Sequence, residues 1–562
     1  MTKRNAARTL GTAAISLLLA ATTMVGAQSI EDLTNPAPGD WPTYGRDLEM
    51  TRFSPLDLIN RDNVDQLRIV GTRDLGLGGK AQFSPVEYDG VLYIGGADTV
   101  LALDATNGQL IWSHKVELDP NGQGTTMRGG VVVYNGNVFA TLEDGRVIAL
   151  DRETGEEVWS TQVGVIDMTE GFTAQPIFAD GKIVVGPVGG DSGGVNGRVV
   201  ALNSEDGSIA WQFNIIPTPG EPGFETWDPP TAAQWGGGSA WAPGAYDSVN
   251  RLVIYGTGNP TPLFRPGFRS GDNLYTASYI ALHVDTGELA WYYQVIPSEE
   301  WDADMQTTPV VMDINIQDQD RRVALLPTTT GWFVMLDAAS GEFIDAYNIF
   351  EQQTGMSPTV LTGFEEDGTP IIDDSMRITD PSESVLYCAF RWASFEGAAF
   401  SPQANLYYRP TTLDCQDMSV QPLPDDWEPG HSAAPKVRKP HPDMFDYYGA
   451  LTAVDPSTGE ISWQFTTPYD QHTGPVATAG DLVFAGFPDR TFRAFDAENG
   501  DVLWEQILPA RFAGEPITYE VDGQQYVAVI NGGTGTSNTG TMTGAAPQVS
   551  SATTIVFIFA VP

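Results

Sequence analysis

The chain has few cysteines, few histidines and few basic residues. Only 2 Cys and 5 His occur among its 562 residues. Cys388 and Cys415 lie too far apart for a Cys-x-x-Cys-His motif, which excludes a covalently attached c-type haem. Lys and Arg together number 29 against 72 Asp and Glu, so the net charge is −43. Because such a surface repels phosphate groups, neither nucleic acid nor an anionic membrane is expected as a partner.

Long hydrophobic runs are missing beyond the first residues of the chain. A basic start (residues 3–8) precedes a short apolar run (10–24) and a small-residue cleavage site (25–27). This order is typical of a secretory signal peptide, which we place at residues 1–27. No later stretch approaches the roughly 18 apolar residues of a membrane span. We therefore expect a periplasmic protein of residues 28–562 without a membrane anchor, in a compartment where the two cysteines can form a disulfide.

A short pattern recurs along the chain. Two small or apolar residues precede Asp, and Gly and Trp follow at fixed distances, as in ALDATNGQLIW. The copies start at positions 102, 149, 201, 281, 335, 453 and 494. Those at 201 and 281 have Asn203 and His283 in place of the Asp, and the copy at 335 keeps the turn but lacks the Trp. The Asp suits a tight turn, the Gly suits a left-handed backbone, and the Trp is expected to pack between neighbouring repeats.

The repeat predicts an all-β fold, an eight-bladed β-propeller. Short strands that recur roughly every 45 residues are typical of four-stranded blades around an axis. Seven copies give seven blades, and a degenerate region near 386–410 is interpreted as the eighth. The last strand, at 554–561, is expected to join strands from near the mature N-terminus and to close the ring.

One stretch in the middle of the chain carries the candidate site. Its motifs are GGGSAW (236–241), GTGN (256–259) and EEWDAD (299–304). They supply the hydroxyl of Ser239, the indole of Trp241 and the amide of Asn259. Asp302 and Asp304 lie two residues apart, which in a strand would put both on one face. Amide and carboxylate oxygens are ligands for hard cations, so we predict a cation beside an aromatic platform that suits a flat, anionic cofactor.

The Trp-ended repeat resembles the tryptophan-docking motif of the quinoprotein alcohol dehydrogenases. Residues 40–67, DWPTYGRDLEMTRFSPLDLINRDNVDQL, resemble the N-terminal signature of the same family. Its members are eight-bladed propellers with tryptophan-docking repeats that bind pyrroloquinoline quinone (PQQ) and a metal ion. The resemblance covers essentially the whole mature chain and is nearest to the soluble, haem-free sorbose or aldose-type branch. It implies PQQ together with Ca²⁺ or a lanthanide ion as cofactors.

The resemblance also assigns contacts with the quinone. Trp241 matches the floor beneath the quinone, and Ser239 matches a Thr that contacts it. Arg128 matches an Arg that binds a PQQ carboxylate, and Thr173 matches a Thr with a similar role. Gln82 stands where a cofactor-contacting Glu is usual.

Metal ligands and the base follow in the same way. Asn259 matches the metal-binding Asn, Asp302 the general base beside the metal, and Asp304 the extra acidic ligand of lanthanide-dependent members. The family's Glu ligand falls in GPVGGDSGGVNG, where either Asp191 or Ser192 can stand. We favour Asp191 because a hard cation prefers a carboxylate. In this chemistry the cation polarises the quinone carbonyl, and a carboxylate takes the proton of the alcohol.

Other positions depart from the family pattern. The adjacent Cys pair that usually covers the quinone is missing from this sequence. Thr329, in PTTTG, replaces a Lys or Arg that touches the quinone oxygens. Arg391 replaces an Asn that precedes a Trp, and it is a candidate to supply the missing positive charge. Both positions are kept as cofactor-binding candidates.

Two functions follow from these residues. The first is an exported dehydrogenase that oxidises a small alcohol or sugar with PQQ and passes electrons to a separate, soluble cytochrome c. The alternative is a non-catalytic propeller that binds other proteins, which Thr329 and the missing Cys pair favour. A scaffold has no need for Trp241, Asn259 and two neighbouring aspartates together, so we favour the enzyme.

Overall fold

The structure is a computed structural model of the 562-residue chain. It describes residue 1 and residues 28–77, 84–119, 130–166, 170–190, 194–264, 267–380, 382–389, 392–393, 395–420, 436–440 (backbone only), 447–471, 473–512, 514–532 and 553–562. Helices in these ranges are short: α1 (Glu31–Thr34), α2 (Ile349–Thr354) and the 3-10 turns η1 (Val64–Gln66), η4 (Phe224–Thr226), η5 (Pro230–Trp235) and η6 (Asp374–Met376). Within the described part, therefore, no helix has the length and apolar character needed to cross a bilayer.

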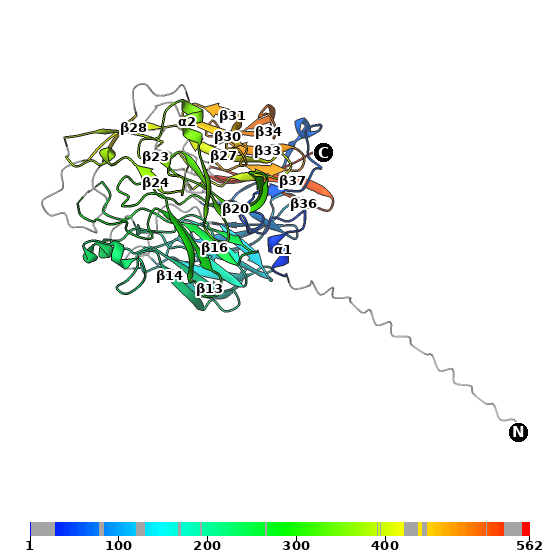
Figure 1. The fold of residues 1–562 in the computed structure, drawn as a ribbon. Coiled ribbons are helices and arrows are strands. Elements are labelled where there is room, and N and C mark those ends of the chain that lie inside the picture. The colour runs from blue at the N-terminus through cyan, green and yellow to red at the C-terminus, as the bar shows by residue number, and fades with distance from the viewer. Residues whose placement is uncertain are drawn as a thin grey trace.

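Eight antiparallel sheets form the blades of a propeller (Figure 1). Each blade is given from its buried first strand to its more exposed last strand. The first blade contains β3 (Val86–Tyr88), β4 (Val91–Gly95), β5 (Thr99–Asp104) and β6 (Leu110–Lys115), and the second contains β7 (Val131–Tyr134), β8 (Asn137–Thr141), β9 (Arg146–Asp151) and β10 (Glu157–Gln162). The third contains β11 (Ile177–Ala179), β12 (Lys182–Val185), β13 (Arg198–Asn203) and β14 (Ile209–Asn214), and the fourth contains β15 (Ala245–Asp247), β16 (Leu252–Gly256), β17 (Ser278–His283) and β18 (Leu289–Gln294).

The remaining four blades follow the same plan. The fifth contains β19 (Val310–Ile316), β20 (Gln319–Pro327), β21 (Trp332–Asp337) and β22 (Phe343–Asn348), and the sixth contains β26 (Ala399–Ser401), β27 (Leu406–Thr412), β30 (Gly449–Val454) and β31 (Ile461–Thr467). The seventh contains β32 (Val476–Thr478), β33 (Leu482–Gly486), β34 (Thr491–Asp496) and β35 (Val502–Ile507), and β1 (Phe53–Ser54) pairs with β32 in parallel. The eighth contains β36 (Ile517–Val521), β37 (Gln524–Gly532), β38 (Thr554–Ala560) and β2 (Arg68–Asp74). The prediction of eight blades is confirmed.

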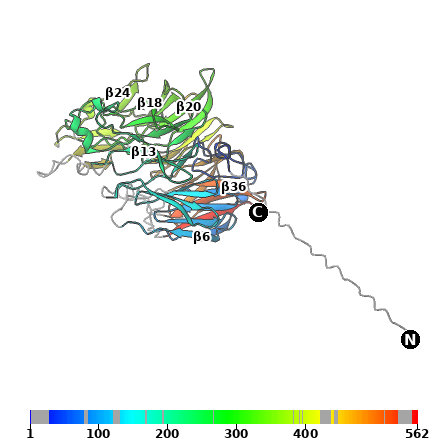
Figure 2. The ribbon, with the colours of Figure 1, turned by 90° about the horizontal axis from the view of Figure 1, so that it is seen from below.

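The two ends of the chain close the ring in one blade. β2 pairs antiparallel with β38, and Arg68 lies opposite Ala560. The blue N-terminal strands accordingly lie beside the orange and red C-terminal strands in both views of the ribbon (Figure 1 and Figure 2). The prediction that the last strand joins strands from near the mature N-terminus is confirmed.

The region near 386–410 is not the eighth blade, and that assignment was wrong. β27 is the second strand of the blade that also holds the repeat starting at 453. The segment before it belongs to a separate three-stranded sheet of β25 (Val385–Cys388), β28 (Cys415–Val420) and β29 (Lys436–Pro440), and β23 (Leu361–Phe364) pairs with β24 (Pro370–Ile372). The true eighth blade escaped notice because its strands carry no Asp-Gly-Trp turn and their pairing joins opposite ends of the sequence.

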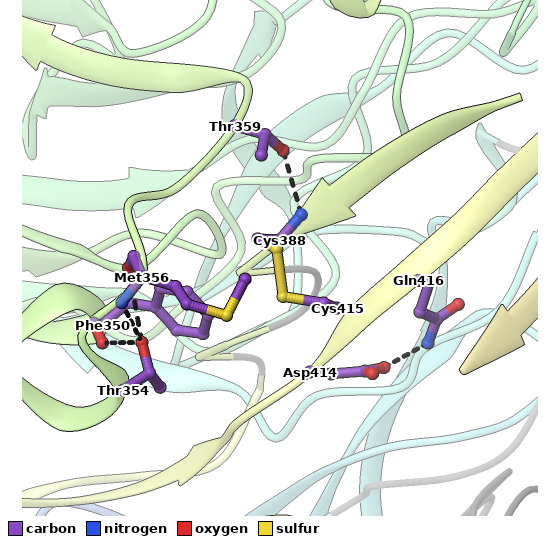
Figure 3. Close-up of a disulfide and its surroundings, with 8 residues drawn as sticks. All are labelled: Phe350, Thr354, Met356, Thr359, Cys388, Asp414, Cys415 and Gln416. Atoms are coloured by element: carbon purple, nitrogen blue, oxygen red, sulfur yellow. Dashed lines mark hydrogen bonds between the residues drawn. A yellow bond between two sulfur atoms is a disulfide. The ribbon is translucent and has the colours of Figure 1, made fainter. Parts of the chain in front are cut away.

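A disulfide joins two neighbouring strands of the three-stranded sheet (Figure 3). Cys388 lies directly opposite Cys415 in the β25–β28 pair, with their Cα atoms 4.0 Å apart. The amide of Cys388 also donates a hydrogen bond to Thr359 Oγ1 at 2.9 Å. The predicted bond between these cysteines is confirmed, and it links β25 to β28 covalently.

Tryptophans of the repeat contact the next blade in one consistent way. Trp112 Nε1 donates to the backbone oxygen of Arg152 at 2.9 Å, directly after the Asp of the next repeat. The same bond recurs from Trp159 to Ser204, Trp211 to Val284, Trp291 to Ala338 and Trp463 to Ala497. Each ring also covers the Gly of that next repeat: a Cβ on Gly155 would lie 2.6 Å from a ring carbon of Trp112. Gly is therefore required twice, for its left-handed backbone and for the space that the ring occupies.

This contact can be measured with a pair of substitutions. Gly155 has φ +71° beneath Trp112, whereas Gly136 has φ +81° with no atom near the position of its Cβ. Both Gly155→Ala and Gly136→Ala strain the backbone, but only Gly155→Ala also overlaps a ring. We expect Gly155→Ala to lower the free energy of unfolding by about 1–3 kcal/mol more than Gly136→Ala, measured by chemical denaturation. Equal losses would contradict the ring contact as the reason for the glycine.

The segment that carries the N-terminal signature contacts most of the blades. Backbone oxygens between Gly39 and Arg52 accept hydrogen bonds of 2.8–3.1 Å from the first strands of seven blades. The donors are the amides of Glu520, Glu87, Val133, Tyr246, Val311, Phe400 and Ala477. One stretch of chain therefore ties together blades that are distant in sequence, which gives the signature a structural reason.

Arg52 anchors this segment in the interior. Its guanidinium is buried and donates to the backbone oxygens of Tyr44 (2.6 Å), Pro475 (3.0 Å) and Pro516 (2.7 Å). It also pairs with Glu515 at 3.2 Å, and the hydroxyl of Tyr44 donates to the same carboxylate at 2.9 Å. Removal of the guanidinium would leave a buried carboxylate and three buried carbonyl groups without this partner.

Arg52→Ala is therefore expected to be strongly destabilising. Breaking a buried ion pair by removing one partner costs about 3–5 kcal/mol, and we expect a loss of that size in chemical denaturation. Arg61→Ala is the matched control, because Arg61 pairs with Asp496 and Glu498 at the surface with a third of its side chain exposed. Such a surface pair contributes about 0–1 kcal/mol. A loss at Arg52 no larger than that at Arg61 would refute the anchoring role.

Candidate active site

Three loops at one end of a blade meet around Asp304. Trp241 precedes β15, Asn259 follows β16, and Asp304 lies between β18 and β19. The carboxylate of Asp304 accepts a hydrogen bond from Trp241 Nε1 at 3.1 Å and another from the backbone N–H of Asn259 at 2.6 Å. Asp304 and Asn259 are buried and Trp241 is half-buried. One carboxylate thus contacts both the predicted platform and the backbone of the residue that carries the predicted amide ligand.

Two further predicted residues attach to this group. Thr173 Oγ1 donates to the backbone oxygen of Trp241 at 2.7 Å, so the segment before β11 holds the backbone of Trp241. Ser239 Oγ accepts from the amide of Gly190 at 2.9 Å. The backbone oxygen of Ser239 accepts from the amide of Gly258 at 3.0 Å. The structure therefore brings these predicted residues together from separate parts of the sequence.

Glycines make this close approach possible. A Cβ on Gly237, which has φ +109°, would lie 2.4 Å from the backbone oxygen of Asn259. A Cβ on Gly258 would lie 3.2 Å from an oxygen of Asp304. The Gly-rich motifs are needed because backbone, rather than side chains, fills the space beside the polar group.

Asp302 does not lie in a strand. Residues 301–308 have no regular structure, and Asp302 takes a left-handed backbone with φ +67°. The alternation expected of a strand therefore does not apply to the Asp302–Asp304 pair. Asp302 is buried, with 6% of its surface exposed.

A buried neighbour contacts the peptide groups around Asp302. Glu299 Oε1 accepts from the amide of Trp301 at 2.5 Å and from the amide of Ala303 at 2.9 Å. Burial raises the pKa of Glu299 to about 7, with a smaller contribution in the same direction from the charge of Asp302. Glu299 was not predicted from the sequence, because a run of acidic residues does not show which one contacts the peptide groups around Asp302.

Thr329 lies on the loop between β20 and β21. Its side chain is buried, and its Oγ1 has no hydrogen-bond partner among the described residues. Its backbone oxygen accepts from the amide of Trp392 at 3.0 Å. Phe395, three residues further along, lies with its ring centroid 6.4 Å from that of Trp241. Trp392 and Phe395 were also missed, since that segment was interpreted as part of a blade.

Several predicted residues lie outside the described part of the chain. They are Gln82, Arg128, Asp191 with its alternative Ser192, and Arg391. In the described part, no group of three or more His, Cys, Asp or Glu side chains is arranged to hold a metal ion. The described oxygen donors are the amide of Asn259 and the carboxylates of Asp302 and Asp304. This donor chemistry suits a hard cation such as Ca²⁺ or a lanthanide rather than a soft metal.

Comparison with known proteins places the chain in a family. The model for the β-propeller domain of PQQ-dependent glucose, ethanol and alcohol dehydrogenases matches residues 41–357 and 446–527. The chain belongs to the PQQ-dependent alcohol dehydrogenases. It is 32% identical to the quinoprotein alcohol dehydrogenase PedH of Pseudomonas putida, over 92% of this chain and 91% of PedH. The resemblance inferred from the repeat and the signature is thereby confirmed at the level of the family.

Other PQQ-dependent alcohol dehydrogenases extend the comparison. The 1-butanol dehydrogenase (cytochrome c) of Thauera butanivorans is 31% identical over 88% of this chain and 75% of its own. The structure of a europium-containing methanol dehydrogenase superposes with a TM-score of 0.86 at 26% identity, over 94% of this chain and 99% of the other. The family fold thus extends over nearly the whole chain.

Proposed function

We propose that this chain is an exported quinoprotein dehydrogenase that oxidises a small alcohol and passes the electrons to a separate cytochrome c. The observation that carries the proposal is Asp304, which accepts hydrogen bonds from both the indole of Trp241 and the backbone N–H of Asn259 within a member of this family. The names of the relatives favour an alcohol over a sugar, and the cytochrome c named for the butanol dehydrogenase favours such an acceptor.

The described residues fit PQQ and a hard cation. Trp241 offers a flat indole whose Nε1 is held by Asp304, as a floor for a planar ring requires. The donor set is made of oxygens, and the hydroxyl of Thr329 is buried with no partner among the described residues. When bound, PQQ supplies an electron-accepting carbonyl that the cation polarises as a Lewis acid.

The residues of this chain would bind the cation and the quinone with separate side chains. Asn259, Asp302 and Asp304, together with Asp191, would hold the cation. Trp241, Ser239 and Thr173 would hold the quinone. Thr329 would contact it where other members of the family have a Lys or Arg.

Residues outside the described part complete the cofactor contacts that we propose. They are Gln82, Arg128 and Arg391. The carboxylate of Asp302 would accept the hydroxyl proton of the alcohol, which is the task of a general base.

A dye-linked activity screen tests this function. Purified protein is loaded with PQQ and either Ca²⁺ or La³⁺, and dye reduction is followed with alcohols, aldehydes and sugars. We expect reduction that depends on the metal, on PQQ and on a primary alcohol. A protein that binds both cofactors yet reduces no dye with any of these substrates would contradict a dehydrogenase of this class. Activity with sugars alone would show that the substrate is a sugar, as in the sorbose or aldose-type branch, and not a simple alcohol.

A further inference from the structure

The backbone at Asp302 is held in a conformation that a residue with a Cβ disfavours. Its φ of +67° lies in the left-handed region, where the Cβ comes close to the following carbonyl oxygen. In a loop without regular structure, such a conformation persists only where surrounding groups enforce it. No strand or helix fixes the backbone at Asp302. The direction in which its carboxylate points therefore depends on the groups that hold this left-handed conformation.

A single oxygen of Glu299 contacts the peptide groups on both sides of Asp302. Oε1 accepts from the amide of Trp301 at 2.5 Å and from the amide of Ala303 at 2.9 Å. The residue is completely buried, so water does not compete for these bonds. Hydrogen bonds to a carboxylate in such surroundings are stronger than those between neutral groups.

The flanks of the loop are fixed by other groups. Before Asp302, Trp301 Nε1 donates to the backbone oxygen of Met376 at 2.9 Å, and the guanidinium of Arg377 lies 4.6 Å from the centre of the same ring. After it, the amide of Met305 donates to the backbone oxygen of Thr257 at 3.0 Å. Between these anchors, the Glu299 carboxylate contacts the peptide groups on both sides of Asp302.

Glu299 is itself held in place. A guanidinium nitrogen of the buried Arg269 donates to the backbone oxygen of Glu299. Arg269 also donates to the backbone oxygens of Thr261 and Pro262 at 3.3 Å, in the loop that follows Asn259. The residue that contacts the peptides of Asp302 is therefore connected to the segment that carries the predicted amide ligand.

We propose that Glu299 is a positioning residue for the catalytic base. By accepting from the amides of Trp301 and Ala303, it fixes the left-handed turn that directs the Asp302 carboxylate to the substrate. Glu299 does not touch the reacting atoms. This inference rests on the proposed function, since it requires Asp302 to act as the base.

Three variants of the PQQ- and metal-loaded protein test the role. Glu299→Ala removes the acceptor, and Glu299→Met removes it while filling most of the space. Glu299→Gln keeps an oxygen that can accept from both amides. We expect the Ala and Met variants to lose about 10–100-fold in kcat, as supporting residues of metal sites do, while the Gln variant stays close to the unmutated protein. The KM for the alcohol should change little, because a misdirected base affects the transition state rather than substrate binding.

A matched control separates this role from a loss of stability. Asp247 is also completely buried, and its Oδ1 accepts from the amides of Val249 and Asn250 at 3.1 and 3.2 Å. It lies opposite Leu252, at the far end of β16 from Asn259. Asp247→Ala should lower the melting temperature and leave the kcat of the folded, loaded protein unchanged.

The possible results separate a failure of the positioning role of Glu299 from a failure of the proposed function. An unmutated protein that is inactive under every condition refutes the proposed function. An active unmutated protein whose Ala and Met variants keep their kcat refutes the positioning role alone. A Gln variant as impaired as the Met variant also refutes it, because charge rather than the two hydrogen bonds would then matter. If neither the Ala nor the Met variant folds while the Gln variant does, Glu299 is structural and the proposal is wrong.

Discussion

Asp302→Asn is expected to reduce kcat by about 10²–10⁴-fold, the usual contribution of a positioned general base. Asn has the same shape and adopts a left-handed backbone more readily than most residues, so the loop at φ +67° should be preserved. What the substitution removes is the carboxylate that accepts the proton. PQQ binding, measured by the absorbance of the bound quinone, should largely survive.

The control for this substitution is an aspartate that is remote from the site. Asp285 is exposed in a turn and pairs with Arg251 at 2.9 Å. Asp285→Asn should leave kcat unchanged under the same loading conditions. If the Asp302→Asn protein turns over at the unmutated rate, another group acts as the base and the assignment of Asp302 fails.

The second large effect concerns the choice of metal. We expect the unmutated protein to prefer a lanthanide to Ca²⁺, and Asp304→Ala to lose most of its activity with La³⁺. Asp302, Asp304 and Asp191 would place three carboxylates around one ion, and like charges this close oppose one another unless a cation offsets them. A trivalent ion offsets three carboxylates fully, whereas Ca²⁺ leaves excess negative charge beside an anionic cofactor.

Asp304 has two roles in the structure, so this experiment needs its own control. Its carboxylate accepts from Trp241 Nε1 and from the amide of Asn259, and its removal loosens both. Trp241→Phe removes the first bond and narrows the indole to a single aromatic ring, but it keeps the carboxylate of Asp304 and its bond to the backbone of Asn259. We expect Trp241→Phe to reduce activity with both metals by the same factor. Equal activity of the unmutated protein with Ca²⁺ and La³⁺, or full La³⁺ activity of Asp304→Ala, would overturn the preference.

The sequence was sufficient for the architecture because the repeat has a direct physical meaning. A Gly beneath each docked ring and an Asp in each turn are local requirements, so they can be read without knowing the fold. The eighth blade has no such turn, since β36, β37, β38 and β2 are held by pairing between the ends of the chain. Pairing over that distance leaves no local pattern, which is why the region near 386–410 was assigned in its place.

The candidate site was predictable to the extent that single residue types reveal their chemistry. Trp241, Asn259 and Asp304 stood out as an indole, an amide and a carboxylate, and Asp304 bonds the indole of Trp241 and the backbone N–H of Asn259. The sequence could not show that Asp304 is the residue that joins them. It also could not show that Glu299 binds the peptides around Asp302, because the next residue in the chain, Glu300, is chemically identical.

A cofactor titration tests whether these residues hold PQQ on a hard cation. Purified apoprotein is titrated with PQQ in the presence of La³⁺, of Ca²⁺ or of a chelator, and the absorbance of the bound quinone is followed. We predict saturable uptake of one PQQ per chain with a metal ion, weak uptake with the chelator, and loss of the quinone absorbance when a primary alcohol is added. A protein that takes up no PQQ saturably with either metal does not bind the cofactor as proposed.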